Sequence, residues 1–262
     1  MHARADLRPQ TIAALRAAGC VFAEEEADVL LVGAGDEAEL ATMVARRCAG
    51  EPLETVVGWV DFCGVRVMVD PGVFVPRRRT QVLARVAIAT ARDGATVVEL
   101  CCGAGAIAAV VAASVTGVRL FASDTDAAAV RCAQRNLAPY GVRPVVGDLF
   151  DAIPKEVAGT VDVLVANVPY VPSAAVEFLP AEAREHEPRI ALDGGGDGLD
   201  VLRRIAVQAP AWLSTGGCLM VETSLEQVDT ASTVMADSGL RPDVVCDDDL
   251  DVAVVLGRAQ SS

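Results

Sequence analysis

The sequence predicts an α/β fold: a doubly wound, mostly parallel, seven-stranded sheet that follows a small helical domain and a linking β-hairpin. From about residue 80 onward, short apolar runs alternate with helical stretches, which is typical of a parallel sheet covered by helices on both faces. Before that point much of the chain is alanine-rich at helical spacing. Its 262 residues suffice for one large domain and a small appendage.

Residues 1–55 are expected to form the small helical domain, which we interpret as a substrate-docking unit. In its first helix, Pro9 suits the first turn and Gly19 suits the stop. The linking hairpin is expected within residues 56–75, where two short strands would turn at Cys63-Gly64. The helices of the first section are expected at 8–19, 24–33 and 36–49.

Residues 76–262 carry the predicted sheet. Its strands are expected at 96–101, 118–124, 143–148, 161–167, 216–223, 241–246 and 251–257. Its helices are expected at 80–92, 105–114, 126–138, 198–213 and 225–238. Because the last two strands are too close for a helical crossover, we predict that they form an antiparallel hairpin.

Composition limits the possible locations and partners. The chain is 52% hydrophobic, no stretch approaches the roughly 20 apolar residues of a membrane span, and the opening MHARADLRPQ lacks a signal core. We therefore expect a cytoplasmic protein without membrane association. Eight cysteines without a C-x-x-C pair, and only two histidines, do not favour a metal site. A formal net charge of −14 disfavours nucleic acid as a partner.

A glycine loop after the first strand predicts a nucleotide-like ligand. Gly103 and Gly105 allow the backbone to approach a ligand closely, and the following helix start adds N–H donors. Asp124 ends the second strand, where an acid can hydrogen-bond two ribose hydroxyls. Asp148 ends the third strand, within reach of an adenine amine.

Two ligands fit this loop. Gly103-x-Gly105-x-x-Ala108 with Asp124 about 20 residues on also satisfies the dinucleotide fingerprint, so NAD is an alternative. However, Glu99 precedes the loop, where a carboxylate would hold an ammonium group and repel a pyrophosphate. This favours S-adenosylmethionine. A second glycine pair, Gly33-Ala34-Gly35, is followed by no acid-ended strand and is interpreted as a helix boundary.

The fourth strand ends in Asn167-Val168-Pro169-Tyr170, which suits a planar nitrogen-bearing group. The amide oxygen of Asn167 can accept an N–H, and Pro169 biases Val168 toward an extended geometry that directs its carbonyl outward. The ring of Tyr170 offers a face for stacking. The alternative is a strand that runs into a proline-stopped turn.

These motifs together resemble the HemK/PrmC-type protein glutamine N5-methyltransferases, from about residue 50 to the end of the chain. ELCCGAGAIA resembles the family's D-L-G-T-G-S-G-A-I-A loop, and NVPY resembles N-P-P-Y. HEPRIALDGGGDGLDVLRRI, residues 186–205, resembles the E-P-R-x-A-L-x-G-G-x-D-G-L stretch, which makes the match specific. The chain is most similar to an actinobacterial-type side branch whose substrate is unknown.

The resemblance implies a class I methyltransferase of Rossmann-like fold that methylates a planar side-chain nitrogen, such as a glutamine amide of a peptide chain release factor. It implies that Asn167, Val168, Pro169 and Tyr170 form the catalytic clamp, and that Arg77 lines the substrate mouth beside Asn167 and Tyr170. The implied donor-binding residues are Glu99, Cys101, Cys102, Gly103, Ala104, Gly105, Asp124, Asp148, Leu149 and Asn167. Ion pairing by Glu187 and Arg189 is expected to brace the loop after the clamp.

The chain departs from the family pattern at three places. Val168 replaces a proline, Cys101 replaces the first loop glycine, and P-R-P-E-T reads Pro76-Arg77-Arg78-Arg79-Thr80, without its carboxylate. Three alternatives to protein glutamine therefore stay open. They are a free small molecule with an amide or guanidine nitrogen, a nucleic-acid base, and a protein that binds the donor without catalysis.

Overall fold

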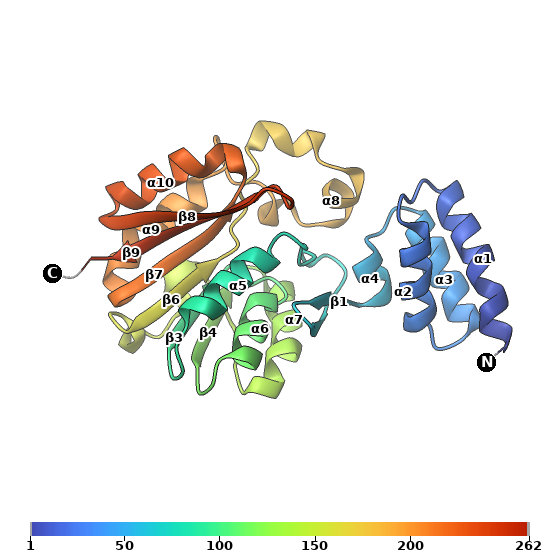
Figure 1. Ribbon diagram of the computed structural model, residues 1–262, viewed down its shortest axis with the longest axis horizontal. Helices are drawn as coiled ribbons and strands as arrows, with labels where there is room; N and C mark the ends of the chain where they lie inside the picture. The colour runs from blue at the N-terminus through green and yellow to red at the C-terminus, as the bar shows by residue number, and fades with distance from the viewer. Residues whose placement is uncertain (1, 261–262) are drawn as a thin grey trace.

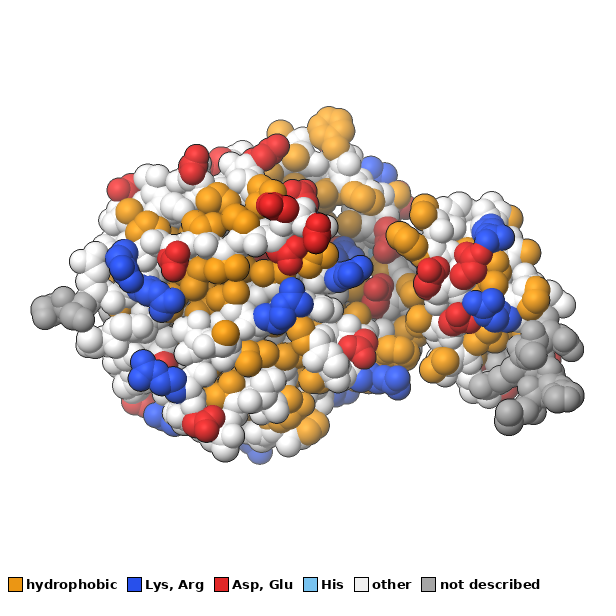
Figure 2. Space-filling view, viewed as in Figure 1, with side chains coloured by type: hydrophobic (Ala, Val, Ile, Leu, Met, Phe, Trp, Pro, Cys, Tyr) orange, Lys and Arg blue, Asp and Glu red, His pale blue; other side chains and the backbone are white. Residues whose placement is uncertain are grey.

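The computed structural model describes residues 2–260, which form two lobes joined by a short hairpin (Figure 1). The N-terminal lobe contains α1 (His2–Ala17), α2 (Ala23–Gly33), α3 (Glu37–Cys48) and the short α4 (Leu53–Val57). They enclose a core that includes Leu15, Leu30 and Leu40. In the space-filling view this lobe stands apart, connected through a narrow neck (Figure 2).

The predicted position of the first helix is wrong at its start. Helix α1 begins at His2, so Pro9 lies inside it rather than in its first turn. The preceding segment His2–Leu7 is rich in alanine and arginine, which favour helix strongly enough to extend it past a proline that removes one backbone donor. The predicted helices at 24–33 and 36–49 are confirmed as α2 and α3 within two residues at each end.

The linker is an antiparallel hairpin of β1 (Trp59–Phe62) and β2 (Val65–Met68), as predicted. Cys63 and Gly64 both have positive φ, 52° and 78°, which matches the twist of a two-residue hairpin turn. Asn136 fastens the hairpin to the larger lobe. Its Oδ1 accepts from the amide of Met68 at 2.8 Å, and its Nδ2 donates to the carbonyls of Met68 at 2.9 Å and Ala104 at 2.8 Å.

The larger lobe contains the predicted seven-stranded sheet, in the order β5-β4-β3-β6-β7-β9-β8. Its first five members in that order are parallel, and β9 runs antiparallel to both β7 and β8. The strands are β3 (Thr96–Leu100), β4 (Arg119–Asp124), β5 (Val145–Val146), β6 (Val161–Ala166), β7 (Leu213–Thr223), β8 (Leu240–Asp247) and β9 (Val252–Ala259). Strand β5 is shorter than predicted because Pro144 lacks a donor and Gly147 follows.

Helices cover both faces of the sheet. One face packs against α5 (Gln81–Thr90), α6 (Ala106–Ser114) and α7 (Ala127–Leu137), and the other against α9 (Asp200–Trp212) and α10 (Val228–Asp237) (Figure 1). Neighbouring residues of one strand serve opposite faces: Val97 belongs to the first core and Val98 to the second. Among residues 2–260, no helix is long and apolar enough to cross a membrane.

A segment between β6 and α9 reaches toward the N-terminal lobe, and the sequence did not predict its elements. It contains α8 (Ala181–His186) between the short 3₁₀ turns Ser173–Phe178 and Arg189–Ala191. The guanidinium of Arg47 on α3 joins the two lobes, because it pairs with Glu182 on α8 at 3.0 Å and with Glu26 on α2 at 2.6 Å. The segment therefore contacts both lobes.

Candidate active site

A cavity of about 200 Å³ lies at the carboxyl ends of β3, β4 and β6. Parallel strands bring their ends to one edge, which is where ligands bind in open α/β sheets. The predicted residues that line it are Glu99, Cys101, Cys102, Gly103, Ala104, Asp124, Asp148, Leu149, Asn167, Val168, Pro169 and Tyr170. Arg79 and Thr80 of the altered P-R-P-E-T segment also line it, as do Phe74, Ile190 and Arg204, which the sequence did not single out.

The glycine loop is shaped by three residues of positive φ: Cys101 at 54°, Gly103 at 53° and Gly105 at 75°. Gly105 does not line the cavity. A Cβ there would lie 3.1 Å from Ala133 and 3.2 Å from Leu137, so close helix packing requires this glycine. Cys101 is unusual, because a residue with a Cβ in this region costs roughly 1–2 kcal/mol. Burial raises the pKa of its thiol to about 12, so the thiol stays neutral and is no nucleophile.

Glu99 is a buried carboxylate beneath the loop, only 2% exposed. One oxygen, Oε2, accepts from the backbone amide of Ala108 in α6 at 2.9 Å. Burial raises its pKa to about 8, the Ala108 amide lowers it, and the charge of Asp124 raises it further. A carboxylate in such a place is stabilised in its charged form by a cation. The site therefore fits the ammonium group of an amino-acid-like ligand.

Asp124 is held by the loop that it faces. Its Oδ2 accepts from the amide of Gly103 at 2.8 Å, and its Oδ1 accepts from the amide of Asp126 at 2.9 Å. Burial raises its pKa, and these amide hydrogen bonds lower it. Each carboxylate oxygen keeps a further lone pair, so Asp124 can still accept from two hydroxyls.

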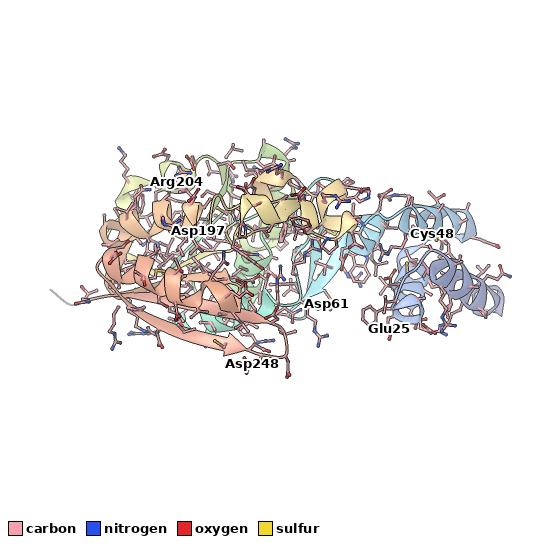
Figure 3. All side chains as sticks on the ribbon, turned by 90° about the horizontal axis from the view of Figure 1, so that it is seen from above. Glu25, Cys48, Asp61, Asp197, Arg204 and Asp248 are labelled. Carbon is pink, nitrogen blue, oxygen red and sulfur yellow. The ribbon has the colours of Figure 1, made fainter. Side chains whose placement is uncertain are left out.

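Asp148 is already engaged by a cation. Its Oδ2 forms an ion pair with Arg204 Nη2 at 2.5 Å. Arg204 comes from α9, on the side of the molecule where Figure 3 also labels Asp197. A ligand amine at Asp148 would share the carboxylate with Arg204, a contact that the sequence did not predict. Leu149, beside it, has a positive φ of 50°, and its carbonyl accepts from the hydroxyl of Ser123 at 3.3 Å.

Asn167 and Tyr170 are held from behind by Thr80 and Glu222. Nδ2 of Asn167 donates to Thr80 Oγ1 at 3.4 Å, which leaves Oδ1 of Asn167 without a partner among the described residues. The Tyr170 hydroxyl donates to Oε1 of Glu222 at 3.0 Å, whereas the buried Oε2 of Glu222 has no hydrogen-bond partner among the described residues. Burial raises the pKa of Tyr170, so its hydroxyl remains protonated. The guanidinium of Arg79 lies 5.5 Å from the Tyr170 ring centroid.

The glycine-rich stretch 193–198 packs against the backbone of the clamp. A Cβ at Gly194 would lie 2.5 Å from the Pro169 carbonyl oxygen, and one at Gly198 would lie 2.2 Å from that of Tyr170. Gln227 also donates to the Tyr170 carbonyl at 2.8 Å. This close packing explains why glycines follow the E-P-R motif.

Arg77 is not among the residues that line the cavity. Its Nη2 pairs with Glu187 Oε2 at 2.6 Å, and the other oxygen of Glu187 accepts from the Val75 amide at 3.1 Å. Glu187 therefore ties the loop after the clamp to the segment before α5. Arg189 pairs within its own loop, with Asp193 at 2.9 Å. The lining arginine of this segment is Arg79.

Comparisons with known proteins agree with this arrangement. Residues 64–205 match the family described as Methyltransferase small domain. A release factor glutamine methyltransferase of Geobacter sulfurreducens is 38% identical over 199 residues, which cover 75% of this chain and 69% of the relative. A 4-amino-L-phenylalanine/4-methylamino-L-phenylalanine methyltransferase of Streptomyces pristinaespiralis is 37% identical over 244 residues, which cover 90% and 81%.

Solved structures support the fold. A methyltransferase of Pyrococcus furiosus superposes with a TM-score of 0.57 at 17% identity, over 76% of this chain and 90% of that one. The ribosomal protein L11 methylase of Lactobacillus delbrueckii subsp. bulgaricus gives a TM-score of 0.53 at 17% identity, over 74% and 84%. The predicted doubly wound fold is thereby confirmed.

Proposed function

Since the chain belongs to the HemK/PrmC family of release factor glutamine methyltransferases, we propose that it transfers the methyl group of S-adenosylmethionine to a planar side-chain nitrogen held at Asn167. One observation carries the proposal: a single cavity joins the buried carboxylate of Glu99 to the clamp of Asn167 and Tyr170. When bound, S-adenosylmethionine supplies a methyl group on a sulfonium, which is an electrophile with its own leaving group.

Three acidic residues bind different parts of the donor. Glu99 pairs with the ammonium group, and Asp124 accepts from the two ribose hydroxyls. Asp148 accepts from the adenine amine while it remains paired with Arg204. The backbone of Gly103 lets the donor lie close to the loop.

Catalysis rests on positioning, because an amide nitrogen is a poor nucleophile whose lone pair is delocalised. The hydroxyl oxygen of Thr80 accepts from Nδ2 of Asn167 at 3.4 Å. This fixes the amide of Asn167 with Oδ1 toward the acceptor. That oxygen and the Val168 carbonyl accept the two N–H groups and direct the lone pair at the methyl group. Such positioning lowers a barrier by up to roughly 7–11 kcal/mol, and the proton leaves afterwards to water.

Two classes of acceptor are supported. The relatives named release factor glutamine methyltransferase support the amide of a glutamine in a protein such as a release factor, a partner that the N-terminal lobe would dock. The second candidate is a free amino acid with a planar nitrogen. It is supported by the relative from Streptomyces pristinaespiralis, whose match covers 90% of this chain against 75% for the Geobacter enzyme.

Labelled-donor transfer to a release factor and to a panel of free amino acids, with mass spectrometry to locate the methyl group, tests the proposal. We expect Asn167→Ala to lose most turnover while calorimetry still detects donor binding. Asp124→Ala is expected to weaken donor binding and leave the fold intact. Full turnover in Asn167→Ala would refute the clamp, and unchanged donor affinity in Asp124→Ala would refute the ribose role.

A further inference from the structure

The guanidinium of Arg79 is a cation on the cavity wall with few of its donors in use. Its Nε pairs with Glu222 Oε1 at 3.3 Å but makes no hydrogen bond of good geometry. Within residues 2–260, neither Nη atom of Arg79 makes a hydrogen bond, and Glu222 is the only carboxylate that pairs with this side chain. The side chain is 43% exposed, so its outer end faces the open cavity. By contrast, Arg77 and Arg204 hold carboxylates at 2.6 and 2.5 Å.

Arg79 lies next to the point where the acceptor nitrogen would be held. Its Cζ is 5.5 Å from the centroid of the Tyr170 ring, and the residue after it, Thr80, contacts Asn167 at 3.4 Å. The cavity lining also contains the apolar side chains of Phe74, Pro76, Pro188 and Ile190. A guanidinium whose Nη donors are free can bind an anion, and its planar donors match a carboxylate.

Glu222, the carboxylate that pairs with Arg79, also contacts Tyr170. Glu222 is 1% exposed and accepts from the Tyr170 hydroxyl at 3.0 Å. Its shortest contact with Arg79 is to Nε, at 3.3 Å, and neither Nη group donates a hydrogen bond to it. The segment Pro76–Thr80 resembles P-R-P-E-T, which has a carboxylate at this position. This chain therefore carries a positive charge at a place where that motif carries a negative one.

We propose that Arg79 binds the carboxylate of a small acceptor, so that the enzyme methylates the planar nitrogen of a free, anionic amino-acid-like molecule. This inference rests on the proposed function, because Asn167 and Tyr170 must hold the nitrogen while Arg79 holds the carboxylate. A neutral glutamine side chain within a protein would leave the two Nη groups of Arg79 unpaired.

Methyl transfer to matched acceptors tests the inference without any variant. The probes are L-glutamine and 4-amino-L-phenylalanine, each compared with its α-carboxamide. For at least one pair we expect the carboxylate form to have a kcat/KM about 10- to 100-fold higher, chiefly through a lower KM. Equal values for every pair, or transfer only to a release factor, would overturn the inference while leaving N-methyl transfer intact.

Variants then test whether Arg79 causes the preference for the carboxylate acceptor. Arg79→Gln should abolish the preference for the carboxylate, Arg79→Lys should keep part of it, and the exposed Arg78→Gln should keep all of it. Donor affinity measured by calorimetry should stay unchanged in all three and reports an intact fold. If Arg79→Gln slowed the carboxylate and carboxamide acceptors equally, Arg79 would have no role in recognising the anion. Loss of donor binding in the unmodified protein would instead contradict the proposed function itself.

Discussion

Binding of S-adenosylmethionine should release a proton from Glu99. In the free protein its pKa is about 8, so about 90% of the side chains are protonated at pH 7. The ammonium group of the donor stabilises the charged form and should lower this pKa to about 5 or below. We therefore expect about 0.9 proton to be released per donor bound at pH 7. Because ionisation must accompany binding, the affinity should rise roughly tenfold between pH 6 and pH 7.

Isothermal titration calorimetry in two buffers of different ionisation enthalpy measures this release directly. Glu99→Gln is the matched control, since its amide oxygen can still accept from Ala108 but holds no exchangeable charge. In that variant the release should disappear and the affinity should lose its rise with pH. A proton count near zero in the unmodified protein, or an equal count in the variant, would refute the role of Glu99.

Glu99 should also make the free energy of unfolding depend on pH. The folded-state pKa of Glu99, about 8, lies above the ordinary value of 4.5, so folding favours the protonated form. This stability is fully present below about pH 4.5 and is lost as the pH rises through about 8. Urea unfolding of the unliganded protein should therefore show a decline between about pH 4.5 and pH 8 that Glu99→Gln lacks. An equally steep decline in both proteins would assign it to other groups.

Three further predictions concern the surroundings of the site. Thr80→Val removes the acceptor for Nδ2 of Asn167 and should lower kcat about 5- to 10-fold with little change in KM, while Thr80→Ser retains activity. Gly194→Ala should destabilise the protein by about 1–3 kcal/mol in urea unfolding, whereas Gly196→Ala, with no atom within 4 Å of its Cβ, should not. Arg47→Met leaves the buried carboxylate of Glu26 unpaired and should cost about 3–5 kcal/mol, so an unchanged midpoint of urea unfolding would contradict that role.

The regular part of the fold could be predicted because its pattern is local. Each central strand is an apolar run followed by a helical stretch, and each functional acid stands at a strand end, as Asp124 does. The segment around α8 was missed because tertiary contacts fix it, such as the pair of Glu182 with Arg47. Its six-residue helix is too short to have a clear periodicity of its own.

The residues that hold Asn167 and Tyr170 from behind could not be predicted for a different reason. Thr80 lies 87 residues from Asn167, and Glu222 lies 52 residues from Tyr170, so no local pattern relates them. One signal was present for Glu222. It stands near the carboxyl end of a parallel strand, by the same rule that indicated Asp124. The backbone conformation of Cys101 could not be predicted either. Cysteine does not favour the left-handed region, and the fold of the loop imposes it.

The amide of Asn136 has a consequence for how the two lobes can be recombined. Its hydrogen bonds to the hairpin go to the backbone N–H and carbonyl of Met68, a residue that is 43% exposed. The junction therefore does not depend on which side chain the hairpin carries there. Chimeric proteins that exchange the N-terminal lobe at β2 should keep this attachment intact, provided that Asn136 is retained on the side of the catalytic lobe.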